Sequence, residues 1–176
     1  MKIALAQLNY QIGNIAANTK RIIQTIQDAK QQGADLVVFA ELSICGYSPL
    51  DLLESNTFID QCEAAIQQIA TSCHDIACII GAPVRNLAAR GKDLYNTAQF
   101  IENGEVKAVV NKSLLPNYDI FDEYRYFEPT NELACVHFKG HTIALTVCED
   151  LWNINSNPLY QESPMDVLIK EKPNLM

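Results

Sequence analysis

The sequence predicts an α/β fold, in which strands and helices alternate at the start and hairpins follow. Residues 2–40 hold a strand–helix–strand unit. Its second strand, residues 36–40, is a continuous apolar run, which is typical of a parallel strand buried on both faces. Another apolar run at residues 76–84 predicts a further strand, and two hairpin signals lie beyond it. With 176 residues, the chain is long enough for one domain with a sizeable core.

Two amphipathic helices are expected around the second strand. Residues 2–9 should form a first, short buried strand. Asn18 can then cap a helix that runs to about residue 32 and stops at Gly33. Residues 57–72 again place apolar side chains at helical spacing and predict the second helix.

Two hairpins are expected in the second half of the chain. The first joins residues 94–101 to residues 106–110 across an Asn-Gly turn, the strongest short-range hairpin signal. The second joins residues 134–138 to residues 141–147 and delivers Cys148. Between the hairpins lies a long irregular stretch with aromatic and charged residues, and such stretches in compact domains tend to be functional.

The end of the sequence suggests a fold that continues. Residues 153–158 are expected to form a loop. Leu175 and Met176 are apolar and resemble the first residues of another buried strand. We therefore expect the last strands of the fold to be missing from these 176 residues.

Composition excludes several classes of protein. The chain is 48% hydrophobic and carries a net charge of −8, which argues against nucleic acid and anionic membranes as partners. No apolar run approaches the ~20 residues of a membrane span, and the first strand is too short for a signal peptide. None of the six cysteines forms a C-x-x-C pair, so the sequence favours reduced thiols in the cytoplasm over disulfides or a zinc site.

Three chemically active residues share one topological position. Glu41, Lys112 and Cys148 each stand where a strand passes into a loop. Strand ends can converge at one rim of an α/β fold, where ligand sites form. Together the three residues supply a general base, a cation and a thiol. The thiol reacts as the thiolate, so its reference pKa of ~8.5 must fall or be matched by a base.

Each of these residues also has a structural interpretation. Cys148 could be a buried core cysteine, because free cysteines are often buried. Glu41 could be a loop acid that faces solvent. Lys112 could extend its side chain to solvent, as most lysines at strand ends do. A second cysteine near Glu41, Cys45, has apolar neighbours and is interpreted as a packing residue.

Longer segments around the three residues resemble one known family. Residues 39–53 (FAELSICGYSPLDLL), 111–127 (NKSLLPNYDIFDEYRYF) and 147–152 (VCEDLW) are similar to motifs of the nitrilase-type carbon–nitrogen hydrolase superfamily. Within it, they resemble the amino-terminal glutaminase domains of glutamine-dependent NAD synthetases. The resemblance implies a four-layer α-β-β-α sandwich, truncated here before its last strands.

The resemblance also implies roles for individual residues. Glu41 would be the general base, and Lys112 would stabilise the oxyanion and the thiolate. Cys148 would attack the side-chain amide of glutamine to form a thioester. Tyr118 and Glu149 match positions that hold the amino-acid end of glutamine in the family.

One further acid has two interpretations. Glu123 could be the second glutamate that many nitrilase-type enzymes place beside the lysine. Alternatively, it could form a salt bridge to Arg125 or another neighbour.

The family implies partners that these residues do not contain. Residues 1–176 would be an incomplete glutamine amidohydrolase domain, whose ammonia serves a synthetase domain of the same full-length chain. That domain would use ATP and Mg to amidate nicotinic acid adenine dinucleotide to NAD. No cofactor or metal is expected in this segment, which has no G-x-G-x-x-G loop. We expect a homo-oligomer, because unpaired sheet edges invite association.

Two other functions fit the same sequence. One is a stand-alone nitrilase-type amidase that acts on another small amide. The other is a non-catalytic scaffold that keeps the fold, against which the intact triad argues.

Overall fold

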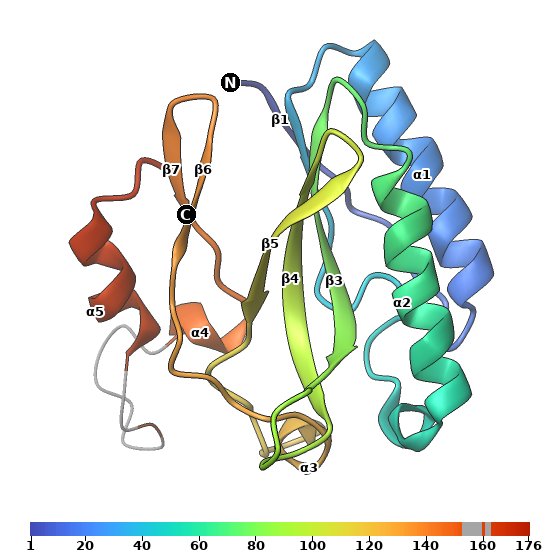
Figure 1. The fold of residues 1–176 in the computed structure, drawn as a ribbon, viewed down its shortest axis with the longest axis vertical. Coiled ribbons are helices and arrows are strands. Elements are labelled where there is room, and N and C mark those ends of the chain that lie inside the picture. The colour runs from blue at the N-terminus through green and yellow to red at the C-terminus, as the bar shows by residue number, and fades with distance from the viewer. Residues whose placement is uncertain (153–159, 161–162) are drawn as a thin grey trace.

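The computed structural model describes residues 1–152, 160 and 163–176, and its centre is a five-stranded sheet (Figure 1). The strand order is β1-β2-β3-β4-β5. β1, β2 and β3 are parallel, whereas β3, β4 and β5 are antiparallel neighbours. The strands are β1 (Ile3–Leu5), β2 (Leu36–Val38), β3 (Ala77–Arg85), β4 (Leu94–Glu102) and β5 (Glu105–Asn111).

Two long helices cover one face of this sheet. α1 (Ile15–Gln31) and α2 (Asn56–Ala70) lie side by side on that face in Figure 1. Their buried stripes, which include Ile22, Ile26 and Ile66, pack with the sheet in one apolar cluster. Burial of such stripes is the main source of helix stability in water.

A two-stranded hairpin and a short helix lie beyond the opposite face. β6 (Cys135–Phe138) pairs with β7 (His141–Ala144), and their apolar side chains form a second cluster with the five-stranded sheet. α5 (Pro164–Leu168) lies on the outer side of the hairpin (Figure 1). The predicted α/β class and the α-β-β-α order of layers are therefore confirmed.

Shorter helices complete the described chain. The α-helices α3 (Glu123–Tyr126) and α4 (Glu149–Trp152) follow β5 and β7, and 3-10 turns span Leu50–Glu54 and Ile169–Glu171. No helix in the part of the chain that the structure describes is long and apolar enough to cross a membrane. The loop predicted at residues 153–158 lies outside the described residues.

The first strand is shorter and less buried than the sequence suggested. Residues 2–9 were expected to be a buried strand, but β1 pairs only through Ile3 to Leu5, and Leu5 is 74% exposed. β1 stands at the edge of the sheet and has one neighbour, β2, which is itself three residues long. A strand with one neighbour on a single short ladder buries only part of its side chains.

The first helix begins one turn earlier than predicted. Its cap is Asn14, whose side chain accepts a hydrogen bond from the backbone N–H of Ala17. Asn18 is instead buried, and its side chain bonds the backbone of Gln11 and Ile44. The expected cap at Asn18 was wrong because both asparagines suit a cap locally, and only tertiary contacts distinguish them.

The remaining elements follow the predictions closely. Asn103 and Gly104 adopt positive φ angles of 52° and 84°, as a two-residue hairpin turn requires. Leu175 forms a parallel bridge with Ile143 in β7, consistent with its expected strand character.

Candidate active site

Glu41 lies three residues beyond the end of β2, and its position depends on a close backbone contact. The chain at residues 40–42 passes over Gly81 in β3. A Cβ atom at Gly81 would lie 2.3 Å from the backbone nitrogen of Leu42 and 2.7 Å from the carbonyl oxygen of Ala40. The backbone N–H of Gly81 also donates to the Ser43 hydroxyl at 3.1 Å. Only glycine permits this approach, which fixes the turn that carries Glu41.

Lys112 is turned inward and bound to two carboxylates. Its side chain is fully buried at the end of β5, so the interpretation that it reaches solvent is wrong. Its Nζ atom lies 2.6 Å from Glu41 Oε1 and 2.8 Å from each carboxylate oxygen of Glu123. Burial alone would lower the pKa of Lys112, but the two glutamates outweigh it and raise that pKa. The ammonium is therefore charged at neutral pH.

Glu123 pairs with Lys112 and not with Arg125. It is buried in α3 and accepts a further hydrogen bond from the Tyr47 hydroxyl at 2.8 Å. Arg125 instead contacts Glu54 on the surface, at 3.2 Å. Burial raises the pKa of Glu123, which Lys112 opposes and Glu41 reinforces. The sequence left two interpretations of Glu123 open, and the structure supports the one that places it beside Lys112.

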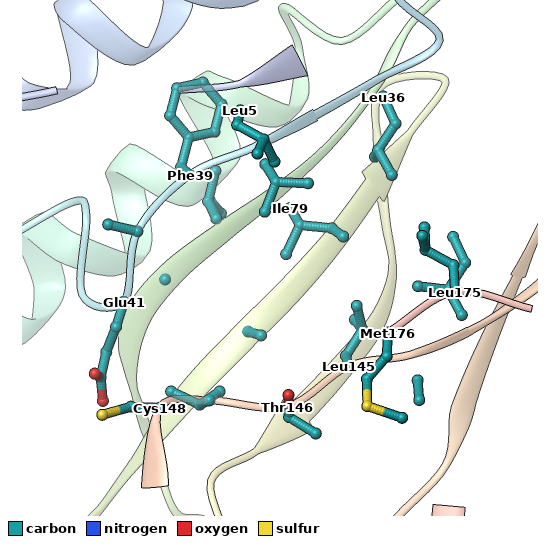
Figure 2. Close-up of a pocket in the computed structure, with 18 of the residues that line it drawn as sticks. Leu5, Leu36, Phe39, Glu41, Ile79, Leu145, Thr146, Cys148, Leu175 and Met176 are labelled. Carbon is teal, nitrogen blue, oxygen red and sulfur yellow. The ribbon is translucent and has the colours of Figure 1, made fainter. Parts of the chain in front are cut away.

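Cys148 stands at a strained turn with its side chain accessible. It has a φ of 47°, a left-handed conformation that non-glycine residues adopt at a cost of roughly 1–2 kcal/mol. The residue is exposed, whereas Cys45 is buried, so the core interpretation holds for Cys45 and fails for Cys148. Figure 2 shows the side chains of Cys148 and Glu41 pointing toward one another. A strained, exposed thiol that faces a carboxylate is a typical arrangement for a nucleophile and its base.

The surroundings of Cys148 favour the protonated thiol over the thiolate. The thiol is accessible but partly desolvated, and this partial desolvation and the charge of Glu41 raise its pKa to about 11, although Lys112 opposes them. The lysine therefore does not produce a standing thiolate. The thiol must be deprotonated by a base as it reacts, and Glu41 is the carboxylate in position to accept the proton.

Asp150 connects the segment after Lys112 to the turn at Cys148 through hydrogen bonds. Its Oδ1 atom accepts the backbone N–H groups of Ser113 and Leu114 at 3.0 and 2.8 Å, and its Oδ2 atom accepts that of Val147 at 3.1 Å. Burial raises the pKa of Asp150 to about 6, and the three backbone donors oppose the shift. This carboxylate clamps the segment after Lys112 to the residues around Cys148.

Glu149 is held between two tyrosines. Tyr118 donates to its Oε2 atom and Tyr160 to its Oε1 atom, both at 2.8 Å. Glu149 is 5% exposed, whereas Tyr118 is 43% exposed. The carboxylate is thus fixed in orientation next to Cys148 and can accept a cationic group.

An apolar cavity of about 260 Å³ lies between the two layers of strands. Glu41 and Cys148 stand at one end of it, and side chains such as Leu36, Ile79 and Leu145 line the rest (Figure 2). Neither Tyr118 nor Glu149 lines this space. An apolar space does not solvate a charged group, so this cavity is unsuited to a charged ligand group, whereas the Glu149 carboxylate lies outside it.

Sequence reasoning missed three residues of the site, namely Tyr47, Asn96 and Asp150. The amide nitrogen of Asn96 contacts Glu41 Oε1 at 2.7 Å and Glu123 Oε2 at 3.2 Å. The available signal was a polar residue inside a run predicted to be a buried strand. No group of three His, Cys, Asp or Glu side chains suited to a metal is found among the described residues.

Comparisons with known proteins place the chain among carbon–nitrogen hydrolases. The family model for carbon-nitrogen hydrolases matches residues 2–174. The glutamine-dependent NAD(+) synthetase of Synechocystis sp. is 40% identical, covering 99% of this chain and 32% of that protein. This chain thus spans about a third of that relative's length.

Solved structures agree with this placement. The glutamine-dependent NAD+ synthetase from Acinetobacter baumannii has a TM-score of 0.80 at 38% identity, covering 87% of this chain and 28% of that one. An amidase from Nesterenkonia sp. has a TM-score of 0.72 at 27% identity, covering 86% of this chain and 56% of that one. One structure of that amidase shows acrylamide added at its active site cysteine.

Proposed function

Because this chain belongs to the carbon–nitrogen hydrolase family, we propose that Glu41, Lys112 and Cys148 hydrolyse the side-chain amide of glutamine. The observation that carries the proposal is the accessible thiol of Cys148, which faces a carboxylate held by a buried ammonium. The relatives named as glutamine-dependent NAD synthetases support the choice of substrate.

In the first step, Cys148 attacks the amide carbon of glutamine. Glu41 accepts the Sγ proton as the carbon–sulfur bond forms, since the raised pKa of Cys148 keeps the thiol protonated at neutral pH. The positive charge of Lys112 stabilises the oxygen that becomes negative in the tetrahedral intermediate. Glu41 then returns the proton to the nitrogen, the carbon–nitrogen bond breaks, and ammonia leaves a γ-glutamyl thioester on Cys148.

In the second step, water replaces the sulfur. Glu41 accepts a proton from the attacking water, and the carbon–sulfur bond breaks with the proton returning to the Cys148 thiol. Glutamate is released. Glu149 is proposed to bind the α-ammonium of glutamine, because its two oxygens are oriented by the tyrosine hydroxyls and no lysine or arginine pairs with it among the described residues.

The ammonia is proposed to serve a second reaction outside residues 1–176. In this proposal, these residues belong to a glutaminase domain, and a synthetase domain of the same protein uses ATP and Mg to convert nicotinic acid adenine dinucleotide to NAD. The share of the relatives that this chain covers supports the division, since about two thirds of their length lies elsewhere.

A second candidate is hydrolysis of another small amide by the same three residues. The likeness to the Nesterenkonia amidase favours it, because that protein shares the fold at 27% identity. The two candidates differ in their need for Glu149. Glutamine has an α-ammonium to pair with this carboxylate, whereas a simple aliphatic amide has none.

The direct test is Cys148→Ala in the natural protein that contains residues 1–176. We expect glutamine hydrolysis to fall by at least about 10⁴-fold, because nucleophilic catalysis is lost. Ammonia-dependent NAD synthesis should survive, since it occurs at a separate site. Cys135→Ala is the matched control, because Cys135 is a partly exposed thiol in β6 outside the site. Retained glutamine hydrolysis in Cys148→Ala, or loss of both activities, would contradict the proposal.

A further inference from the structure

Asn96 contacts the site but has no part in the reaction described above. It is the third residue of β4 and is 1% exposed. An amide nitrogen carries two N–H groups, so Asn96 can donate to Glu41 and Glu123 at once, at 2.7 and 3.2 Å. The backbone carbonyl oxygen of Asn96 also accepts the backbone N–H of Lys112 at 2.8 Å. Neighbouring strands therefore present an amide and an ammonium to the same two acids.

The two donors act on one oxygen of Glu41. Both Lys112 Nζ and Asn96 Nδ2 bond Oε1, at 2.6 and 2.7 Å. Oε2 makes no hydrogen bond with the residues that the structure describes, and the side chain points toward Cys148 (Figure 2). Two fixed donors on Oε1 set the plane of the carboxylate, so that Oε2 is left free to take a proton.

We propose that Asn96 is a positioning residue for amide hydrolysis, which holds the Glu41 carboxylate with one oxygen free toward Cys148 and ties it to Glu123. The inference rests on the proposed function. Lys112 alone cannot set this geometry, because its three N–H groups are shared between three carboxylate oxygens. Asn96 adds a directional donor that carries no charge, so it orients Glu41 without neutralising it.

A purely structural role does not explain this amide. Its Oδ1 atom is buried and has no hydrogen-bond partner among the described residues. An unpaired buried acceptor costs about 1–3 kcal/mol. Turning the amide over would place Oδ1 against two carboxylates, which is worse. Asn96 therefore keeps its Nδ2 hydrogen bonds to Glu41 and Glu123, although this leaves its Oδ1 atom without a donor.

The next residue on the strand provides a contrast. Thr97 is equally buried at 1% exposed, and its hydroxyl donates to the carbonyl oxygen of Ala82 at 2.8 Å. The hydroxyl also accepts from the Gln99 side-chain amide at 3.3 Å, and among the described residues it makes no hydrogen bond to Glu41 or Glu123. Thr97→Val therefore removes buried hydrogen bonds from the same strand and leaves those of the two glutamates intact.

The test is the pH profile of Asn96→Asp in the natural protein that contains residues 1–176. The substitution keeps the shape of the side chain but replaces two donors with a third carboxylate against Glu41 and Glu123. The other titratable or charged groups near this pair, among the described residues, are Tyr47, Lys112, Tyr118, Cys148, Glu149, Asp150 and Tyr160. None of them changes, so a shift between the wild type and the variant reports the new charge.

For Asn96→Asp, we expect the acid limb of the pH profile of glutamine hydrolysis to shift. Like charges at this distance disfavour ionisation, so the acid limb of kcat/KM should move to higher pH by about one unit or more. For Thr97→Val, the acid limb of kcat/KM should stay at the wild-type pH. An Asn96→Asp variant that loses rate equally at every pH would overturn the proposal.

Asn96→Ser provides a second test, because it is smaller and keeps one donor. We expect kcat to fall up to about 100-fold with little change in KM, since the base is misplaced while the substrate site is untouched. An unchanged kcat would overturn the proposal. Either failure would leave the Cys148→Ala result standing, so failure of the Asn96 role and failure of the proposed function are distinguishable.

Discussion

Asn96 lies in β4 of the five-stranded sheet, and Glu41 and Lys112 follow its strands β2 and β5, whereas Cys148 and Glu149 follow a two-stranded hairpin. The sheet is backed on one face by the apolar cluster of α1 and α2. The hairpin is supported by pairing between β6 and β7 and by the bridge from Ile143 to Leu175, in the part of the chain that the structure describes. Glu41 and Lys112, the proposed base and cation, thus adjoin a sheet that is backed by two helices, which we call the platform. Cys148, the proposed nucleophile, follows a hairpin with less support.

The contacts between the five-stranded sheet and the hairpin, which we call the join, therefore decide whether Glu41, Lys112 and Cys148 come together. Apolar side chains connect them, but a cavity of about 260 Å³ also lies between them. The Asp150 carboxylate supplies directional bonds across the join, to Ser113 and Leu114 on one side and to Val147 on the other. Such a site depends both on the sheet that positions Glu41 (the platform) and on the contacts between sheet and hairpin (the join). A substitution at Gly81 perturbs the first, and one at Asp150 perturbs the second.

The largest expected effect comes from the platform, through Gly81→Ala. The new Cβ atom would lie 2.3 Å from the backbone of Leu42, so the turn that carries Glu41 must shift. A displacement of about 1 Å in a catalytic group can cost about 100-fold in rate, and we expect at least that loss of kcat/KM. Overpacking should also lower the free energy of unfolding by about 1–3 kcal/mol, measured by chemical denaturation.

Gly140→Asn is the matched control on the hairpin. Gly140 has a φ of 76°, which asparagine tolerates, and nothing lies within 4 Å of its added Cβ atom. Glutamine hydrolysis should change little. A Gly81→Ala variant with wild-type activity would show that the contact of Glu41 with β3 does not determine its position.

A smaller effect is expected from the join, through Asp150→Asn. Burial raises the pKa of Asp150 from 3.8 to about 6, so between these values the folded state binds more protons than the unfolded state. The free energy of unfolding of the wild type therefore increases as the pH falls through 6 toward 3.8. Asparagine does not titrate. Relative to the variant, the wild type should gain up to about 3 kcal/mol between pH 7 and 4.

The measurement is denaturant unfolding of both proteins across this pH range. A stability difference that does not depend on pH would contradict the assignment of the shift to Asp150. At pH 7 the variant should also hydrolyse glutamine more slowly, because one backbone N–H of the join loses its acceptor. Gly140→Asn again gives the reference for a change in the hairpin that leaves the join intact.

Local sequence predicted each half of the site, but not how the halves meet. The strand ends at Glu41, Lys112 and Cys148 follow from apolar runs and turn residues. Family motifs, and no local pattern, then suggested Tyr118 and Glu149. The partner of Glu123 could not be chosen, because Arg125 is near in sequence and Lys112 is near only in space.

The errors have the same physical origin. Asn18 and Asn14 are equally good caps locally, and the buried contact of Asn18 with Ile44 depends on the folded chain. Asn96 appeared to be an ordinary strand residue until Glu41 and Glu123 were brought to it. Likewise, the pKa of Cys148 depends first on its desolvation and then on the charges of Glu41 and Lys112, and all of these are set by the tertiary fold.

The most direct test of the central claim is peptide-mapped mass spectrometry after exposure to a diazo ketone analogue of glutamine. The reaction is run with and without excess glutamine, in the natural protein that contains residues 1–176. We expect a label on Cys148 that glutamine suppresses, and none on the partly exposed Cys135. Labelling spread over several cysteines, or labelling of Cys148 that glutamine does not reduce, would contradict a glutamine-binding site with Cys148 as its nucleophile.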